Sequence, residues 1–228
     1  MSFGEYIAGA ADLAAVAGLV ALATRLVART LLPHLRGVDR VLALVALFTA
    51  GLLACHVIPL CLGVLSRGSV LVAAALLAGG ALLLSRRRPR AVVGPRPGGG
   101  RAPVATWVLT LYACAVVVAY LSTAVTTAVT QVDFMEFHEP AVASWIQHGS
   151  LWPILSLYPG HMSGYYPNNG DVLLLAASLP WRSDFLVRLV DVPYLAALAL
   201  AVWAIARELG AGRLSGQLYA LLLVFLPV

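Results

Sequence analysis

The sequence predicts an all-α polytopic membrane protein with about six transmembrane helices and an outer loop that contains short interfacial helices. Of its 228 residues, 61% are hydrophobic and only 11% are charged, and the mean hydropathy is +0.90. Soluble domains are about half apolar and about a quarter charged. The composition therefore excludes a soluble globular domain, a disordered chain and a nucleic-acid-binding protein.

The apolar runs are long enough to be spans, because a helix needs about 20 residues to cross the hydrocarbon core. A shorter apolar run at 171–181 is too short to span, so we expect a re-entrant or surface helix there. A sixth long run begins near Leu214 and reaches Val228 without a polar cap, which indicates missing C-terminal helices or a partner chain that completes it. The five other runs lie at about 6–28, 41–64, 68–85, 104–128 and 186–206.

Charge predicts the orientation of these spans, since loops rich in Arg or Lys face the cytoplasm. All 15 basic residues are Arg, and most lie in the connections near 25–40 and 86–101. The segment 131–170 has no Arg and should face outward. Arg182 and Arg188 fit this scheme less well. The prediction is a plasma-membrane protein with its N-terminus and its acidic loop outside.

Three parts follow from this pattern. Residues 1–85 form an N-terminal three-helix membrane part. Residues 86–103 are an Arg-, Pro- and Gly-rich cytoplasmic linker that lies against anionic headgroups. Residues 104–228 contain one span, the outer loop at 129–185 and two further spans.

The outer loop holds the chemically unusual residues. Asp133, Glu136, His138 and Glu139 lie within one short stretch after the fourth run. Pro suits the first turn of a helix and Gly suits the position after its end, so the sequence predicts a helix over 140–148 that is followed by Gly149. Its apolar face consists of Ala141, Val142, Trp145 and Ile146.

Three short motifs in this half of the chain carry a resemblance. They are Asp133-x4-His138-x-Pro140-x4-Trp145-x3-Gly149-Ser150-Leu151, then Tyr166-Pro167-x2-Gly170-Asp171-x-Leu173-Leu174, then Ala206-Arg207-Glu208-Leu209-Gly210. Together they resemble the first outer loop and next span of GT-C glycosyltransferases, which are similar to protein mannosyltransferases and aminoarabinose transferases. These enzymes take a sugar from a polyprenyl-phosphate carrier. The resemblance covers about residues 104–228.

The resemblance implies an inverting transfer at the outer face, with a polyprenyl-phosphate sugar as donor. Asp133 matches the family's acidic residue that acts at the acceptor, and Glu136 and His138 would orient it as further catalytic residues. If a divalent cation takes part, Asp133 and Glu136 would favour Mg²⁺ or Mn²⁺. The candidate substrate-binding residues are Glu139, Trp145, Tyr165, Tyr166 and Asn168.

Simpler interpretations exist for the same residues. Asp133 and Glu136 also fit a helix-capping pattern, and His138 can serve as a hydrogen-bonding residue of the loop. The aromatic residues fit an interfacial belt. Arg188 and Asp191, in an apolar helix, fit an ion pair or the lining of a cavity. A non-catalytic membrane protein whose outer loop binds a partner or lipid headgroups is the alternative function.

Overall fold

The computed structural model describes residues 1–87, 104–126, 134–152 and 169–225, and the chain is all-α over these residues. Five helices are long and apolar enough to cross a membrane, which confirms the polytopic membrane class. They are α1 (Phe3–Leu31), α2 (Gly37–Cys61), α3 (Arg67–Arg87), α4 (Val104–Thr126) and α7 (Asp191–Glu208), the last preceded by the 3₁₀ turn η3 (Val187–Leu189). Shorter helices are α5 (Glu139–His148), α6 (Asn169–Ser178) and α8 (Arg213–Phe225).

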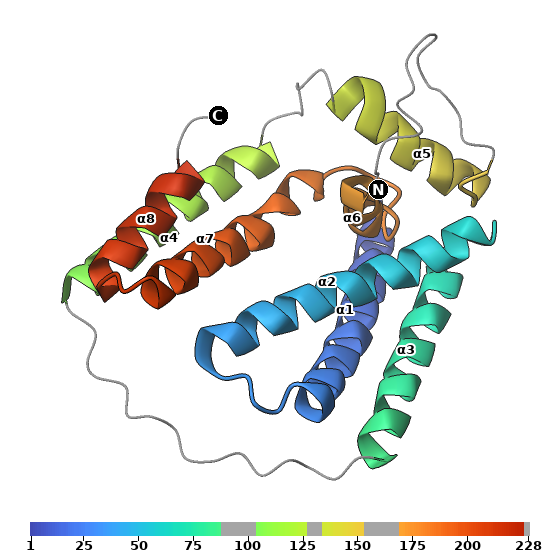
Figure 1. The fold of residues 1–228 in the computed structure, drawn as a ribbon. Helices are drawn as coiled ribbons and strands as arrows, with labels where there is room; N and C mark the ends of the chain where they lie inside the picture. Colours follow the sequence, from blue (N-terminus) through green and yellow to red (C-terminus); the bar gives the residue numbers. More distant parts are fainter. Residues whose placement is uncertain (88–103, 127–133, 153–168, 226–228) are drawn as a thin grey trace.

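Helices α1, α2 and α3 form an N-terminal bundle (Figure 1). Small side chains let the backbones approach closely: Ala23, Ala78 and Ala81 form one buried cluster between α1 and α3. A Cβ added at Gly51 would lie 3.0 Å from Val20 and 3.1 Å from Leu77. Small residues at such contacts are typical of helix packing in membranes, where van der Waals contact drives association.

The helix ends that the charge pattern places outside lie together, on the upper right side of Figure 1. The Trp181 indole N–H donates to the carbonyl of Tyr6 at the start of α1. The backbone N–H of Leu65, between α2 and α3, donates to the carbonyl of Gly149 over 2.8 Å. The opposite ends, which carry most of the described arginines, lie along the left and lower sides. The fold therefore agrees with a chain that crosses the membrane alternately.

Helix α6 is short, as predicted, and it is buried against α2 and covered by α5. Of the two expectations for this segment, a re-entrant or a surface helix, the surface helix is therefore wrong. A helix that is apolar on all sides is stable only when it is enclosed by protein or lipid. Its buried apolar side chains, together with that of the residue that follows it, are Val172, Leu175, Ala176 and Leu179.

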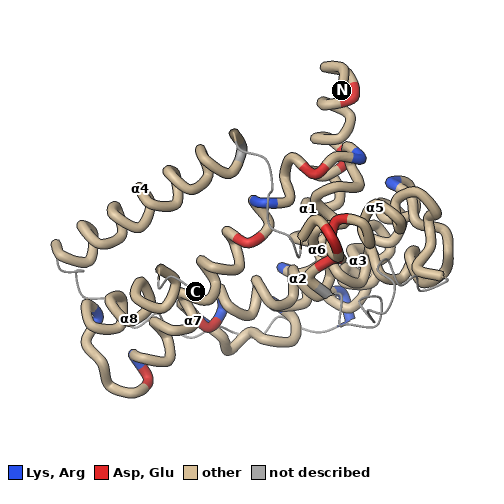
Figure 2. The backbone as a smooth tube through the Cα atoms, turned by 90° about the horizontal axis from the view of Figure 1, so that it is seen from above, with Lys and Arg blue, Asp and Glu red and all other residues tan. Residues whose placement is uncertain are grey.

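Helices α4, α7 and α8 form the second group of apolar helices (Figure 1). The Gln217 side-chain amide of α8 donates to the Thr106 carbonyl and to the Thr110 hydroxyl of α4. The run expected from near Leu214 is present as α8, but its 13 described residues are shorter than a span. Helix α4 has no charged residue, whereas charged residues elsewhere gather near helix ends (Figure 2).

Candidate functional site

A cavity of about 500 Å³ lies where the end of α4 meets the starts of α6 and α7. The π-helical turn η1 (Phe134–His138) lies beside it. Ligand pockets usually have a volume of about 300–1,000 Å³ and combine an apolar wall with a few polar groups. The polar side chains in this wall come from Tyr120, Thr123, His138, Asp171, Arg188 and Asp191, and the apolar ones from Ala124, Phe134, Leu173, Leu174, Val187 and Val190.

His138 and Asp171 form a hydrogen-bonded pair in the cavity wall. His138 Nδ1 lies 2.6 Å from Asp171 Oδ1. The Asp171 side chain is 6% exposed, whereas that of His138 is 50% exposed. Burial raises the pKa of the Asp171 carboxyl, and the hydrogen bond and charge of His138 oppose that increase. The pair thus couples a buried carboxylate to an accessible imidazole.

The local sequence explains why these two residues meet. Pro140 lies in the first turn of α5, where its missing N–H costs nothing, so α5 begins beside His138. Asp171 lies in the first turn of α6, where a carboxylate interacts favourably with the helix dipole. Gly149 ends α5 at φ 67°, and its carbonyl accepts from Leu65, which anchors α5 to the N-terminal bundle.

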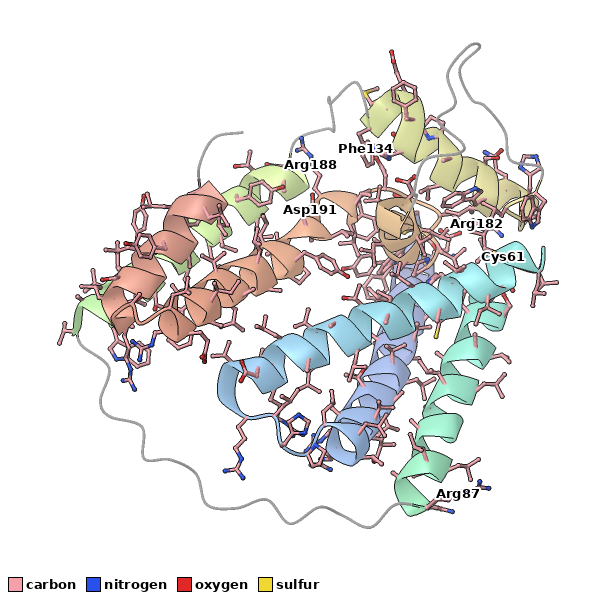
Figure 3. All side chains as sticks on the ribbon, in the orientation of Figure 1. Cys61, Arg87, Phe134, Arg182, Arg188 and Asp191 are labelled. Atoms are coloured by element: carbon pink, nitrogen blue, oxygen red, sulfur yellow. The ribbon has the colours of Figure 1, made fainter. Side chains whose placement is uncertain are left out.

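Arg188 and Asp191 lie in the cavity wall at the start of α7 (Figure 3). Tyr120 of α4 donates to the carbonyl of Arg188 over 3.5 Å, which links α4 to this turn. Both residues line the cavity, which is one of the two interpretations that the sequence left open for these charges.

Glu139 is partly buried next to the cavity residues, at the first position of α5. Burial raises the pKa of its carboxyl, and the negative charge of Asp184 raises that pKa further. Glu136, one turn earlier, is exposed to solvent. Neither carboxylate belongs to the cavity wall. Of the predicted catalytic and substrate-binding residues that the structure describes, only His138 lines the cavity.

Trp145 corrects the sequence prediction. It was a candidate for substrate binding, but its side chain is 6% exposed and belongs to the hydrophobic core with Val142 and Leu175. The reason is its place on the apolar face of α5, which packs on α6. The four remaining candidates, Asp133, Tyr165, Tyr166 and Asn168, lie outside the described residues.

A metal site is not formed by the part of the chain that the structure describes. In these residues no group of three or more His, Cys, Asp or Glu side chains is close enough to hold an ion. Asp133, which was paired with Glu136 as a candidate Mg²⁺ or Mn²⁺ ligand, lies outside the described residues.

Sequence reasoning missed Asp171 as a site residue, although the motif with Tyr166 and Pro167 included it. The available signal was a carboxylate directly before an apolar run too short to span. A buried ionisable group in a membrane protein is costly and usually functional, but its partner His138 lies 33 residues away in the sequence. Such a distance hides the pair from any local pattern.

Comparison with known proteins found no family model, curated protein sequence or solved structure that matches this chain. The fold and the cavity therefore carry the functional argument.

Proposed function

We propose that the protein is a membrane glycosyltransferase, or part of one, that transfers a sugar from a polyprenyl-phosphate donor to an acceptor on the extracytoplasmic face. The observation that carries this proposal is the cavity at the end of α4, which joins an apolar wall to His138, Asp171, Arg188 and Asp191. The resemblance of residues 104–228 to GT-C enzymes supports the same assignment.

The chemistry of the cavity fits a lipid-linked sugar. A guanidinium such as that of Arg188 is suited to a phosphate, because it forms charge-assisted hydrogen bonds. Carboxylates and hydroxyls such as those of Asp191 and Thr123 suit the hydroxyl groups of a sugar. The apolar wall beside α4, a helix that is almost wholly exposed along its span, suits the first isoprene units of a carrier that enters from the bilayer.

The orientation belongs to the proposal as well. The described Arg-rich helix ends lie away from the end of α4 and the starts of α6 and α7 (Figure 1), whose residues line the cavity, and Arg-rich loops remain in the cytoplasm. The cavity would therefore open towards the outer face of the plasma membrane. A transferase at that face needs an activated sugar that is already attached to lipid, because soluble nucleotide sugars are cytoplasmic substrates.

The alternative function is a non-catalytic protein whose outer segment binds lipid headgroups or a protein partner. Arg188 in the cavity wall is compatible with the capture of a lipid phosphate by either kind of protein. Turnover separates the two functions, since a binding protein retains the donor without breaking its sugar–phosphate bond.

The test uses the whole chain in proteoliposomes. Polyprenyl monophosphates that carry radiolabelled mannose, glucose or arabinose serve as donors, and an envelope extract serves as acceptor. Wild-type protein should move label from one donor to the acceptor. Ala124 lines the cavity and is 7% exposed, so Ala124→Phe places a large side chain inside the cavity. This variant should transfer sugar about 10²-fold more slowly.

Ala115→Phe is the matched control, because Ala115 lies on the same helix with an exposed side chain outside the cavity wall. It should retain the wild-type rate. Wild-type protein that consumes none of the donors, or equal rates in the two Phe variants, would refute the proposed function.

A further inference from the structure

The His138–Asp171 pair has the geometry of a catalytic base and its support. An ionised carboxylate can only accept hydrogen bonds, so with Asp171 ionised His138 Nδ1 is the donor and Asp171 Oδ1 the acceptor in the 2.6 Å contact. A neutral imidazole carries one N–H, and with the proton on Nδ1 the other nitrogen, Nε2, has a free lone pair. Half of the His138 side chain is exposed, and this residue lines the cavity.

From this arrangement we infer that His138 is the general base of the transfer, and that Asp171 is a positioning residue that fixes its ring and its tautomer. The inference rests on the proposed function, because it assigns a role within that reaction. It differs from the expectation based on Asp133, in which His138 only orients another residue.

In the transfer step, His138 Nε2 removes the proton of an acceptor hydroxyl while the hydroxyl oxygen forms a bond to the anomeric carbon of the donor sugar. The bond between that carbon and the phosphate oxygen breaks, and its electron pair leaves with the lipid phosphate. The resulting imidazolium then releases its proton to the phosphate or to water. A positioned base of this kind contributes about 10²–10⁴-fold to a rate.

The burial of Asp171 is what distinguishes this pair from a surface contact. Most exposed ion pairs contribute little, because solvent screens them and the side chains must be ordered. Asp171 is 4% exposed as a residue and lies in the first turn of α6, so its position is fixed by packing. A fixed carboxylate can hold an imidazole in one orientation, as the triads of hydrolases require.

A purely structural role is the competing explanation, in which the pair only ties η1 to α6. His138→Asn separates the two roles. The Asn side-chain nitrogen lies one bond beyond Cγ, as Nδ1 does in His, so the variant can still donate to Asp171. It has no counterpart of Nε2 and therefore no base. The structural explanation predicts a small loss of transfer rate in His138→Asn, and the base role predicts a large one.

The experiment measures transfer from the donor that the wild-type protein uses in the proteoliposome assay. His138→Asn and Asp171→Asn should each lower kcat about 10²–10⁴-fold with little change in the KM for the donor. Asp171→Glu should recover part of the activity. His148→Asn is the matched control: His148 is the last residue of α5, the helix that follows His138, is exposed, and contacts the Ser144 carbonyl instead.

A second measurement needs no substrate. In protein labelled with ¹⁵N in the histidine rings, the signal that disappears in His138→Asn belongs to His138. That signal should show the Nδ1–H tautomer in the wild-type protein and the Nε2–H tautomer in Asp171→Asn, since an Asn side chain can donate to Nδ1.

Transfer by His138→Asn within about twofold of the wild-type rate would overturn the base role, since loss of a general base should lower the rate at least about 10²-fold. An unchanged tautomer in Asp171→Asn would overturn the positioning role. Wild-type protein without transfer from any donor would refute the proposed function and the base role with it, while the tautomer measurement would still decide the role of Asp171.

Discussion

His138 Nδ1 and Asp171 Oδ1 lie 2.6 Å apart although the two residues are 33 positions apart in the chain. The contact joins η1, which follows α4, to α6, which is buried against α2. Because Asp171 is enclosed and His138 is accessible, a carboxylate that could not act on a substrate itself is coupled to a ring that can. This relationship is the basis for the proposal that proton transfer takes place in the cavity.

Arg188 should contribute to donor binding more than to the chemical step. Replacing it with Gln removes the positive charge from the cavity wall, so the Kd for a polyprenyl-phosphate sugar should rise about tenfold, which corresponds to about 1.4 kcal/mol. Isothermal titration in detergent measures this change. Arg182→Gln, at an exposed position outside the wall, is the control. Equal affinity of the two variants would argue against phosphate binding at Arg188.

Gly149 should be necessary for the anchoring of α5. Its φ of 67° disfavours any side chain, and a Cβ there would lie 3.2 Å from the carbonyl oxygen of Leu65. Gly149→Ala should therefore destabilise the protein by about 1–2 kcal/mol, seen as a lower melting temperature in detergent. Gly18→Ala, where a Cβ meets nothing within 4 Å, should cause no loss. A melting temperature unchanged by Gly149→Ala would contradict the turn geometry.

Glu139 should destabilise the folded protein when it is ionised. Burial and the charge of Asp184 raise the pKa of its carboxyl above 4.5, so the folded state binds this proton more tightly than the unfolded state does. The stabilisation that comes from this tighter proton binding is full below pH 4.5, the pKa of the carboxyl in the unfolded chain. It is lost as pH rises through the pKa in the folded protein.

Glu139→Gln should therefore raise the melting temperature by about 1–2 °C at neutral pH, since the group is partly exposed and the effect is small. The gain should vanish near about pH 4, where both proteins carry a neutral side chain. Thermal unfolding at the two pH values measures this difference. A gain that is larger in acid would have the wrong sign for this explanation.

The orientation can be tested by labelling from outside the cell. In a background in which the exposed Cys61 and Cys114 are replaced by Ser, Glu136→Cys should react with a membrane-impermeant maleimide in intact cells. Asp39→Cys, in the first turn of α2 beside the Arg-rich connection, should react only after permeabilisation. The reverse labelling pattern would place the cavity in the cytoplasm and exclude an extracytoplasmic transfer.

The sequence was sufficient for the elements whose signals are local. Apolar length predicted the spans. Pro140 and Gly149 predicted α5, which runs from Glu139 to His148 and ends at a left-handed glycine. These signals are reliable because helix ends have specific backbone requirements.

Tertiary packing determined the features that the sequence did not reveal. The apolar face of α5 is compatible with burial of Trp145 and with a place at the lipid surface, and only the position of α6 decides between them. The pairing of His138 with Asp171 depends on two segments that meet only after the bundle has formed. Local patterns cannot encode such a meeting.

Photo-crosslinking with a polyprenyl-phosphate sugar that carries a diazirine beside the phosphate tests the central claim most directly. We expect labelled peptides from 120–124 and 187–191, which line the cavity, and we expect excess unlabelled donor to compete with this labelling. Label at the exposed α4 positions Trp107, Val108 and Leu111, unaffected by competitor, would show ordinary lipid contact and would contradict a donor site in the cavity.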